Sequence, residues 1–118
     1  MMGAMNTLRT CLLTFLLAAC DLAHASEPEC VIPSKPGGAM DLTCKLAQNA
    51  LQGKPGAAKL KLTYLPGGIG AVAWHTLVSQ RASEANTLVA FSGGSLLNLA
   101  EGKFGKAKAS DVRWVAAL

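Results

Sequence analysis

Residues 30–42, CVIPSKPGGAMDL, contain a short apolar run, a turn rich in proline and glycine, and the beginning of a helical pattern. The apolar run at residues 30–32 predicts a strand. Apolar residues then recur at helical spacing from about Met40 to Gln52, and Gly53 marks the end of that helix. A strand that leads directly into a helix is the opening unit of an α/β fold.

The same alternation continues along the chain. Residues 59–65 predict a second strand, and residues 70–80 predict a second long helix. Residues 87–91 form an uninterrupted apolar run, which is typical of a strand covered on both faces. We expect a short helix at residues 95–101 and a fourth strand at residues 112–118. The pattern predicts one α/β domain with a mostly parallel sheet flanked by helices.

The first 25 residues have the features of an export signal. Arg9 precedes an apolar run at residues 11–19, and the sequence Ala-His-Ala before Ser26 is a signal-peptidase site. The mature chain is therefore expected to begin at Ser26. Cys20 follows a run of small residues, so a lipid anchor at Cys20 is the alternative. Both alternatives place the protein beyond the inner membrane, and we expect a periplasmic protein.

Two cysteines, Cys30 and Cys44, remain after the signal. In an oxidising compartment an even pair in a short chain predicts a disulfide, and two buried free thiols are the alternative. Two cysteines without nearby histidines or a carboxylate cluster do not complete a zinc site, so no metal is expected.

The formal net charge is +4, and all of it lies after the signal. This excess attracts anionic ligands over long range. The lysines are scattered and no aromatic residues alternate with them, so the pattern does not predict a nucleic-acid-binding surface.

Each of the first three predicted strands leads into a Gly-Gly pair immediately before a helix. In a parallel sheet these turns all lie at the carboxyl ends of the strands, the edge at which open α/β proteins bind ligands. Glycines let the backbone approach a ligand, and helix N-termini offer free N–H groups, so the three turns together predict an anion site. The pairs are Gly37 and Gly38, Gly67 and Gly68, and Gly93 and Gly94.

Each of these turns also has a purely structural interpretation. The glycines can serve tight turns and close packing alone. Asp41 can act as a first-turn carboxylate that caps the helix beginning near Gly38. The hydroxyls beside the turns, on Ser34, Ser92 and Ser95, can hydrogen-bond locally instead of to a ligand.

The sequence does not predict an enzyme. Residues 68–73, GIGAVA, match the dinucleotide fingerprint, but no acid follows the next strand to hold a ribose, so no cofactor is expected. Ser92 and Ser95 do not lie in a nucleophile elbow. His75 is the single histidine after the signal and has no evident catalytic partner.

Four stretches of the chain resemble the Bug family of periplasmic receptors, especially its tricarboxylate-binding branch, the substrate-binding proteins of tripartite tricarboxylate transporters. They are residues 30–44 (CVIPSKPGGAMDLTC), 64–71 (YLPGGIGA), 89–98 (VAFSGGSLLN) and 111–115 (DVRWV). The resemblance covers nearly all of the chain after the signal, and the cysteine pair resembles a feature of the same branch.

The resemblance implies a type II periplasmic binding protein, in which two lobes close on a carboxylate such as citrate and deliver it to a membrane permease. Family members are longer, so these residues correspond to part of the first lobe. A receptor that feeds a sensory partner and a non-functional fragment are the alternatives. Matching positions imply a ligand shell of Ser34, Pro36, Gly37, Gly38 and Asp41 from the first turn, Gly67, Gly68, Ile69 and Gly70 from the second, and Ser92, Gly93, Gly94 and Ser95 bordering the site.

Overall fold

A computed structural model of the chain describes residues 27–117. The predicted export signal, its cleavage site before Ser26 and the alternative anchor at Cys20 lie outside the described residues. No helix within residues 27–117 is long and apolar enough to cross a membrane.

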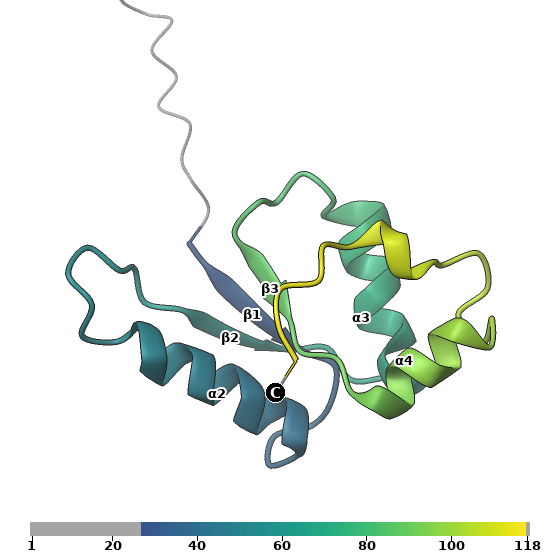
Figure 1. Cartoon of the computed structure of the whole chain (residues 1–118), viewed down its shortest axis with the longest axis horizontal. Coiled ribbons are helices and arrows are strands. Elements are labelled where there is room, and N and C mark those ends of the chain that lie inside the picture. The colour runs from purple at the N-terminus through teal and green to yellow at the C-terminus, as the bar shows by residue number, and fades with distance from the viewer. Residues whose placement is uncertain (1–26, 118) are drawn as a thin grey trace, which may run out of the picture.

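A three-stranded parallel sheet forms the centre of the fold (Figure 1). Strand β1 (Glu29–Ile32) lies between β2 (Lys61–Tyr64) and β3 (Thr87–Val89). Glu29 is opposite Lys61 on one side and Thr87 on the other, so the three strands begin at the same level. The sheet order is therefore β2-β1-β3. After β2 the chain crosses back over β1, and β3 is added on the other side of β1.

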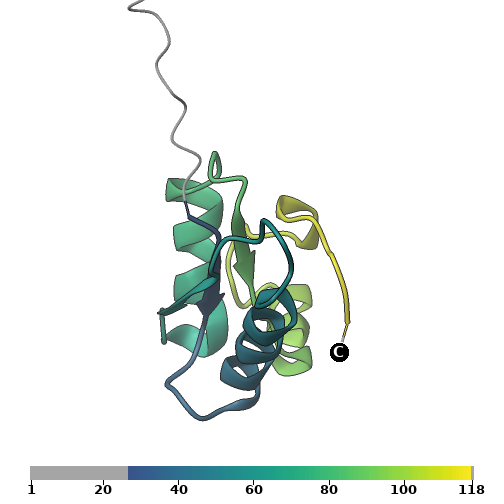
Figure 2. The same ribbon diagram turned by 90° about the vertical axis from the view of Figure 1, so that its left-hand side faces the viewer.

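The helices connect the strands as the parallel arrangement requires. Helix α2 (Ala39–Leu51) joins β1 to β2. A 3₁₀ turn, η1 (Gly68–Gly70), leads into α3 (Ala71–His75), which continues as a π-helical turn, η2 (Thr76–Gln80). Helix α4 (Gly93–Ala100) follows β3, and a 3₁₀ turn, η3 (Ala109–Asp111), follows α4. Figure 2 shows α2 and α3 on opposite sides of the strands.

Two apolar clusters hold these layers together. The first joins β1 and β2 to α2 and has Cys30, Ile32, Cys44 and Leu60 at its centre. The second joins α3 to α4 and the chain after it, and its members are Trp74, Leu99 and Phe104, with Phe91 packed against them. Trp74 is 1% exposed, and its ring centroid lies 4.9 Å from that of Phe91.

The predicted disulfide is present between Cys30 in β1 and Cys44 in α2. The two Cα atoms are 5.8 Å apart, and both side chains are buried. The alternation of β1 places Cys30 and Ile32 on the face that α2 covers, and Cys44 lies on the inner face of that helix. The covalent bond therefore lies inside the first apolar cluster.

An ion-pair network joins the strands at the end of the sheet where the three parallel strands begin. Arg81, which follows η2, donates hydrogen bonds to Glu29 in β1 and to Glu84, with 2.8 Å between Arg81 Nε and Glu84 Oε2. Burial alone would raise the pKa of Glu29, but the hydrogen bonds from Arg81 and Thr63 outweigh burial and lower this pKa. Thr63 in β2 donates to Glu29, and Thr87 in β3 donates to Glu84 at 3.4 Å, so the network connects all three strands to the end of η2.

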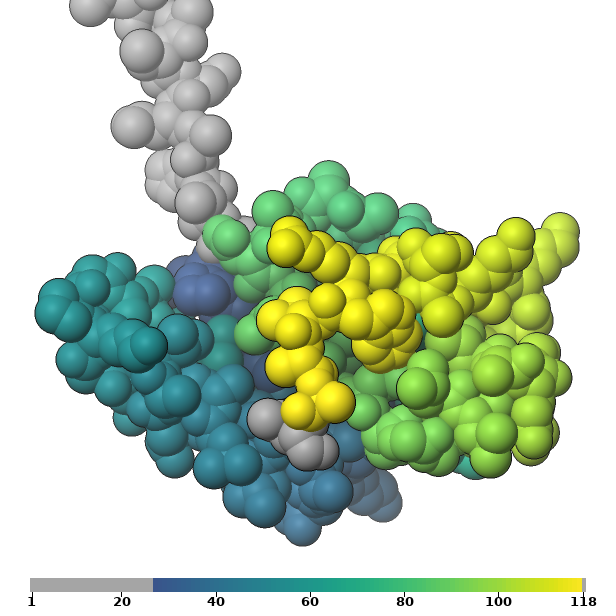
Figure 3. All heavy atoms as spheres, in the orientation of Figure 1, coloured from purple at the N-terminus to yellow at the C-terminus, as the bar shows by residue number. Residues whose placement is uncertain are grey.

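Two expectations about the second half of the chain are wrong. Residues 112–117 form no strand; they run as an extended segment across the face of the molecule seen in Figure 3. Strand β3 is not covered on both faces either, because Leu88 is 39% exposed. Within residues 27–117 no strand pairs with the edge of β3 away from β1. Extended backbone becomes a strand only when a neighbour satisfies its hydrogen bonds, and local sequence does not supply that neighbour.

Candidate functional site

The three glycine turns lie at the carboxyl ends of the strands, as predicted. The turn after β1 comprises residues 33–38, the turn after β2 residues 65–70, and the turn after β3 residues 90–92. The third glycine pair, Gly93 and Gly94, does not precede the helix as predicted but forms the first two residues of α4, directly after this last turn. The chain leaves β1 towards β2 on one side, and β3 is added on the other, so β1 and β3 flank the point where the strand order reverses. Open α/β sheets bind ligands outside this point.

Asp41 organises the first turn from inside. Its carboxylate accepts hydrogen bonds from the Gly37 N–H at 2.7 Å, from Lys45 Nζ at 2.8 Å and from the Tyr64 hydroxyl at 2.8 Å. The hydrogen bond from Lys45, together with those from Gly37 and Tyr64, lowers the pKa of Asp41 to about 2. Asp41 thus ties the turn after β1 to the end of β2.

This arrangement refines the predicted capping role of Asp41. Asp41 does lie in the first turn of α2, but Gly38 is the N-cap and receives no side-chain cap. The carboxylate accepts the N–H of Gly37, one residue before the cap. The first helical hydrogen bond runs from Leu42 N–H to Gly38 C=O. The amides of Ala39, Met40 and Asp41, which precede Leu42, therefore have no acceptor within the helix.

The second turn has an unusual backbone. Gly67, Gly68, Ile69 and Gly70 all have positive φ, with values of 141°, 55°, 54° and 99°. A β-branched residue rarely adopts this conformation, and such strain is typical of segments that have a function. The Ser95 hydroxyl holds the strained segment by donating to the Ile69 carbonyl at 2.7 Å. Ile69 itself is 66% exposed.

The third turn packs against the second. Ser92 caps α4 by accepting the Ser95 N–H at 3.1 Å, and the two hydroxyl oxygens are 3.0 Å apart. A Cβ atom added at Gly70 would lie 3.2 Å from Phe91 Cε2 and 3.2 Å from Ser95 Oγ. The close approach of these two turns therefore requires glycine at position 70.

The predicted ligand shell divides into an exposed and a buried set. Ser34 and Ser92 are half-buried, and the exposed residues are Pro36, Gly37, Gly38, Gly67, Gly68, Ile69, Gly93 and Gly94. Asp41, Gly70 and Ser95 are buried, and all three take part in contacts within the protein. We therefore expect Asp41, Gly70 and Ser95 to position the turns and the exposed residues to meet a ligand.

The hydroxyls at this edge take part in hydrogen bonds within the protein. Ser34 Oγ donates to the Lys35 carbonyl at 3.2 Å, while Ser92 and Ser95 bond to each other. The donors that remain for a ligand are backbone amides at the beginnings of helices, a chemistry suited to carboxylates and other small anions. Within residues 27–117 no group of three or more His, Cys, Asp or Glu side chains is arranged to hold a metal ion.

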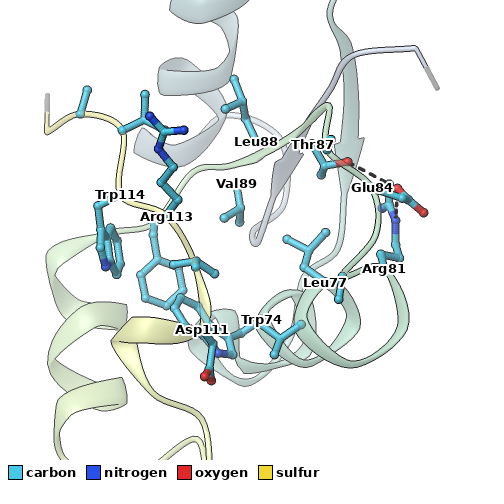
Figure 4. Close-up of a pocket in the computed structure, with 17 residues that line it drawn as sticks. Trp74, Leu77, Arg81, Glu84, Thr87, Leu88, Val89, Asp111, Arg113 and Trp114 are labelled. Carbon is cyan, nitrogen blue, oxygen red and sulfur yellow. Dashed lines mark hydrogen bonds and ion pairs between the residues drawn. The ribbon is translucent and has the colours of Figure 1, made fainter. Parts of the chain in front are cut away.

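Sequence reasoning missed two features. The first is the Tyr64–Asp41–Lys45 network; only the i, i+4 spacing of Asp41 and Lys45 signalled part of it. The second is a pocket of about 710 Å³ beside β3, lined by residues of α3, η2 and the C-terminal segment (Figure 4). This pocket contains none of the predicted ligand residues, so it is distinct from the edge formed by the glycine turns.

Comparison of the chain with family models, with curated proteins and with solved structures gives no match.

Proposed function

We propose that this chain is an exported solute-binding receptor, or part of one, that captures tricarboxylates such as citrate for the permease of a tripartite tricarboxylate transporter. The observation that carries the proposal is the position of the three glycine turns at one edge of a parallel sheet, beside the reversal of strand order. Exposed glycines and helix-start amides at that edge suit a carboxylate ligand. The net charge of +4 favours the approach of such an anion.

The edge is also suited to binding without chemistry on the ligand. The polar side chains of the predicted ligand shell, Ser34, Asp41, Ser92 and Ser95, are held by internal hydrogen bonds, and Asp41 stays ionised because of its three donors. An ionised carboxylate that already accepts several hydrogen bonds is neither a free base nor an available nucleophile. Recognition by backbone amides therefore fits a receptor better than an enzyme.

Gly38 offers a direct test of this proposal. Its φ of −91° and ψ of −179° are open to any residue, and an added Cβ would meet only Ser34 Oγ at 3.8 Å. Gly38→Val should therefore fold, at a cost of about 1 kcal/mol for a poorer N-cap, while its side chain covers the amides of the first turn. We expect the affinity for citrate to fall at least tenfold. Amide chemical shifts recorded at millimolar citrate measure this affinity.

The control is Ala57→Val, which adds the same kind of bulk at an exposed loop position away from the edge. Gly68→Val is not a suitable test, since position 68 has a φ of 55° and its Cβ would lie 3.0 Å from that of Ala71. If Gly38→Val folds and binds citrate as the parent does, the turns are structural and the proposed site is wrong.

A further inference from the structure

The pocket beside β3 has two extended walls. One wall consists of Thr87, Leu88 and Val89, and the other of residues 111–116. Successive side chains of a strand point to opposite faces, so a pocket lined by three consecutive strand residues runs along the edge of that strand. Figure 4 shows Arg113 and Trp114 across the pocket from Leu88 and Val89. We name this pocket the β3 slot.

The hydrogen bonds of β3 show which backbone groups face the slot. The Asn86 carbonyl accepts from Glu29 N–H, and Ala90 N–H donates to the Val31 carbonyl, so these two residues face β1. Backbone groups alternate along a strand, so Leu88 also faces β1, whereas Thr87 and Val89 face the slot. No backbone hydrogen bond joins Thr87 or Val89 to residues 112–116 in the part of the chain that the structure describes.

The side chains around the slot are suited to an extended peptide with one apolar face. Trp74, Leu77 and Val78 line it from α3 and η2. Arg81 and Glu84, at the end near Thr87, pair with each other. Arg113 is exposed and has no ion-pair partner within residues 27–117. Asp111 lies on the same wall, and its carboxylate accepts the Lys108 N–H at 2.8 Å. The slot thus offers apolar contact on one side and, on its C-terminal wall, the guanidinium of Arg113 without an ion-pair partner among residues 27–117.

We propose that the β3 slot binds an extended segment of a partner polypeptide, which adds to the sheet as a strand through the backbone of Thr87 and Val89. An unpaired strand edge is a template for such addition, in which main-chain hydrogen bonds supply affinity and side-chain pockets supply specificity. The unpaired Arg113 favours a segment that carries a carboxylate among β-branched apolar residues. A whole second domain does not fit this description, because residues 111–116 wall off the edge.

The test uses the full chain, exported and processed by the expression host, and the probe peptide acetyl-TVEVTV-amide. Binding is measured by the emission of Trp74 and Trp114, which both line the slot. Two further peptides carry N-methyl groups on alternate residues, one in each register. N-methylation removes N–H donors and keeps the side chains, so we expect at least one register to weaken binding tenfold or more. Equal binding of all three peptides would overturn the proposal.

Two protein variants test the β3 side of the contact. Val89→Pro removes an N–H that faces the slot, and proline is tolerated at an edge position whose N–H does not enter the ladder. Val89→Ala is the matched control, since it loses the same side chain and keeps the amide. We expect Val89→Pro to bind the peptide at least tenfold more weakly than Val89→Ala. Equal affinities for the peptide would contradict strand addition at β3, and the N-methyl series decides the question if Val89→Pro does not fold.

The charge preference and the competing occupants have tests of their own. Exchanging Glu for Lys in the peptide should weaken binding several-fold, and Arg113→Glu should reverse this preference; an unchanged preference would contradict the role of Arg113.

Amide exchange of the free protein should show Thr87 and Val89 unprotected. Protection in the monomer would show that residues 112–117 close the slot themselves, and protection that grows with association would identify a second copy as the occupant. Either result would overturn the proposal of a partner peptide.

Discussion

Asp41 shows how one buried carboxylate can hold a turn, a strand and a helix together. It brings together the Gly37 amide, the Tyr64 hydroxyl and the Lys45 ammonium group, which come from a turn, a strand and a helix. Each donor stabilises the ionised form, so the carboxylate keeps its charge at neutral pH. The position of the first glycine turn relative to β2 therefore depends on this residue.

Because the pKa of Asp41 is lowered from 3.8 to about 2, the contribution of Asp41 to the free energy of unfolding should depend on pH in the acid range. The contribution is complete above the unfolded-state pKa and is lost as pH falls from about 4 to about 2. Asp41→Asn should lower the urea midpoint at pH 7, and its difference from the parent should shrink across that pH range. Urea titrations at pH 7, 4 and 2 measure both effects.

Glu101→Gln serves as the control for this prediction. Glu101 pairs with Lys103 at 2.7 Å, but its side chain is 45% exposed, so its loss should change stability by about 0.5 kcal/mol or less. A parent and an Asp41→Asn variant that lose stability in parallel between pH 4 and pH 2 would show that Asp41 is not the titrating group.

At single positions, the sequence predicts where turns occur better than it predicts which side chains contact one another. The glycine turns could be located because their purpose, a tight exit from a strand, is local. The burial of Ser95 could not be predicted, because it depends on the Ile69 carbonyl, 26 residues earlier in the chain. The same holds for Asp41 in α2, whose tyrosine partner lies in β2, 23 residues later in the chain.

Among the elements, β1 and α2 form a unit that is held together twice, by apolar packing and by the Cys30–Cys44 bond. The bond spans 14 residues of sequence. In the chain-entropy model a loop of this size is worth about 3 kcal/mol, a large share of the stability of a small domain. The first glycine turn lies within this loop, so the bond also limits the motion of the candidate site.

We therefore expect the replacement of both cysteines, Cys30→Ala with Cys44→Ala, to lower the free energy of unfolding by about 3 kcal/mol. Urea unfolding of the exported, processed protein measures the difference. A reductant should destabilise the parent and leave the double variant unchanged, which provides the internal control. Two free thiols in the intact mass of the parent, purified from the periplasm of the expression host, would contradict the bond itself.

The elements that the sequence predicts well are those with strong local signals. The observed bounds of β1, α2 and α4 lie within about two residues of the predicted ones, since glycines and apolar periodicity mark their ends. Residues 112–117 have β-branched and aromatic residues typical of a strand, and their backbone is extended at Val112. These residues form no strand because no neighbouring strand pairs with them; the β3 slot separates them from the sheet.

On the scale of the whole molecule, the candidate site covers a ligand from one side only. Its donors are backbone amides at an open edge, where a helix N-terminus contributes about 0.3 to 1 kcal/mol to anion binding. Two or three such contacts fall short of about 4 kcal/mol, the free energy that corresponds to a millimolar dissociation constant. Citrate should therefore bind this chain no more tightly than about 1 mM.

The long-range field should make this weak binding sensitive to salt. The protein carries a net charge of +4, while fully ionised citrate is an anion of three charges, and at about 10 mM ionic strength the Debye length of roughly 30 Å extends over the whole domain. At about 1 M it falls to roughly 3 Å, so the apparent affinity should drop several-fold. Lys35→Gln, which removes an exposed charge beside the first turn, should reduce this salt dependence, and Lys54→Gln, in the loop after α2, should reduce it less. Titrations of all three proteins at both salt concentrations provide the measurement. Equal citrate affinity at low and high salt would show that the positive charge plays no part in capturing the ligand.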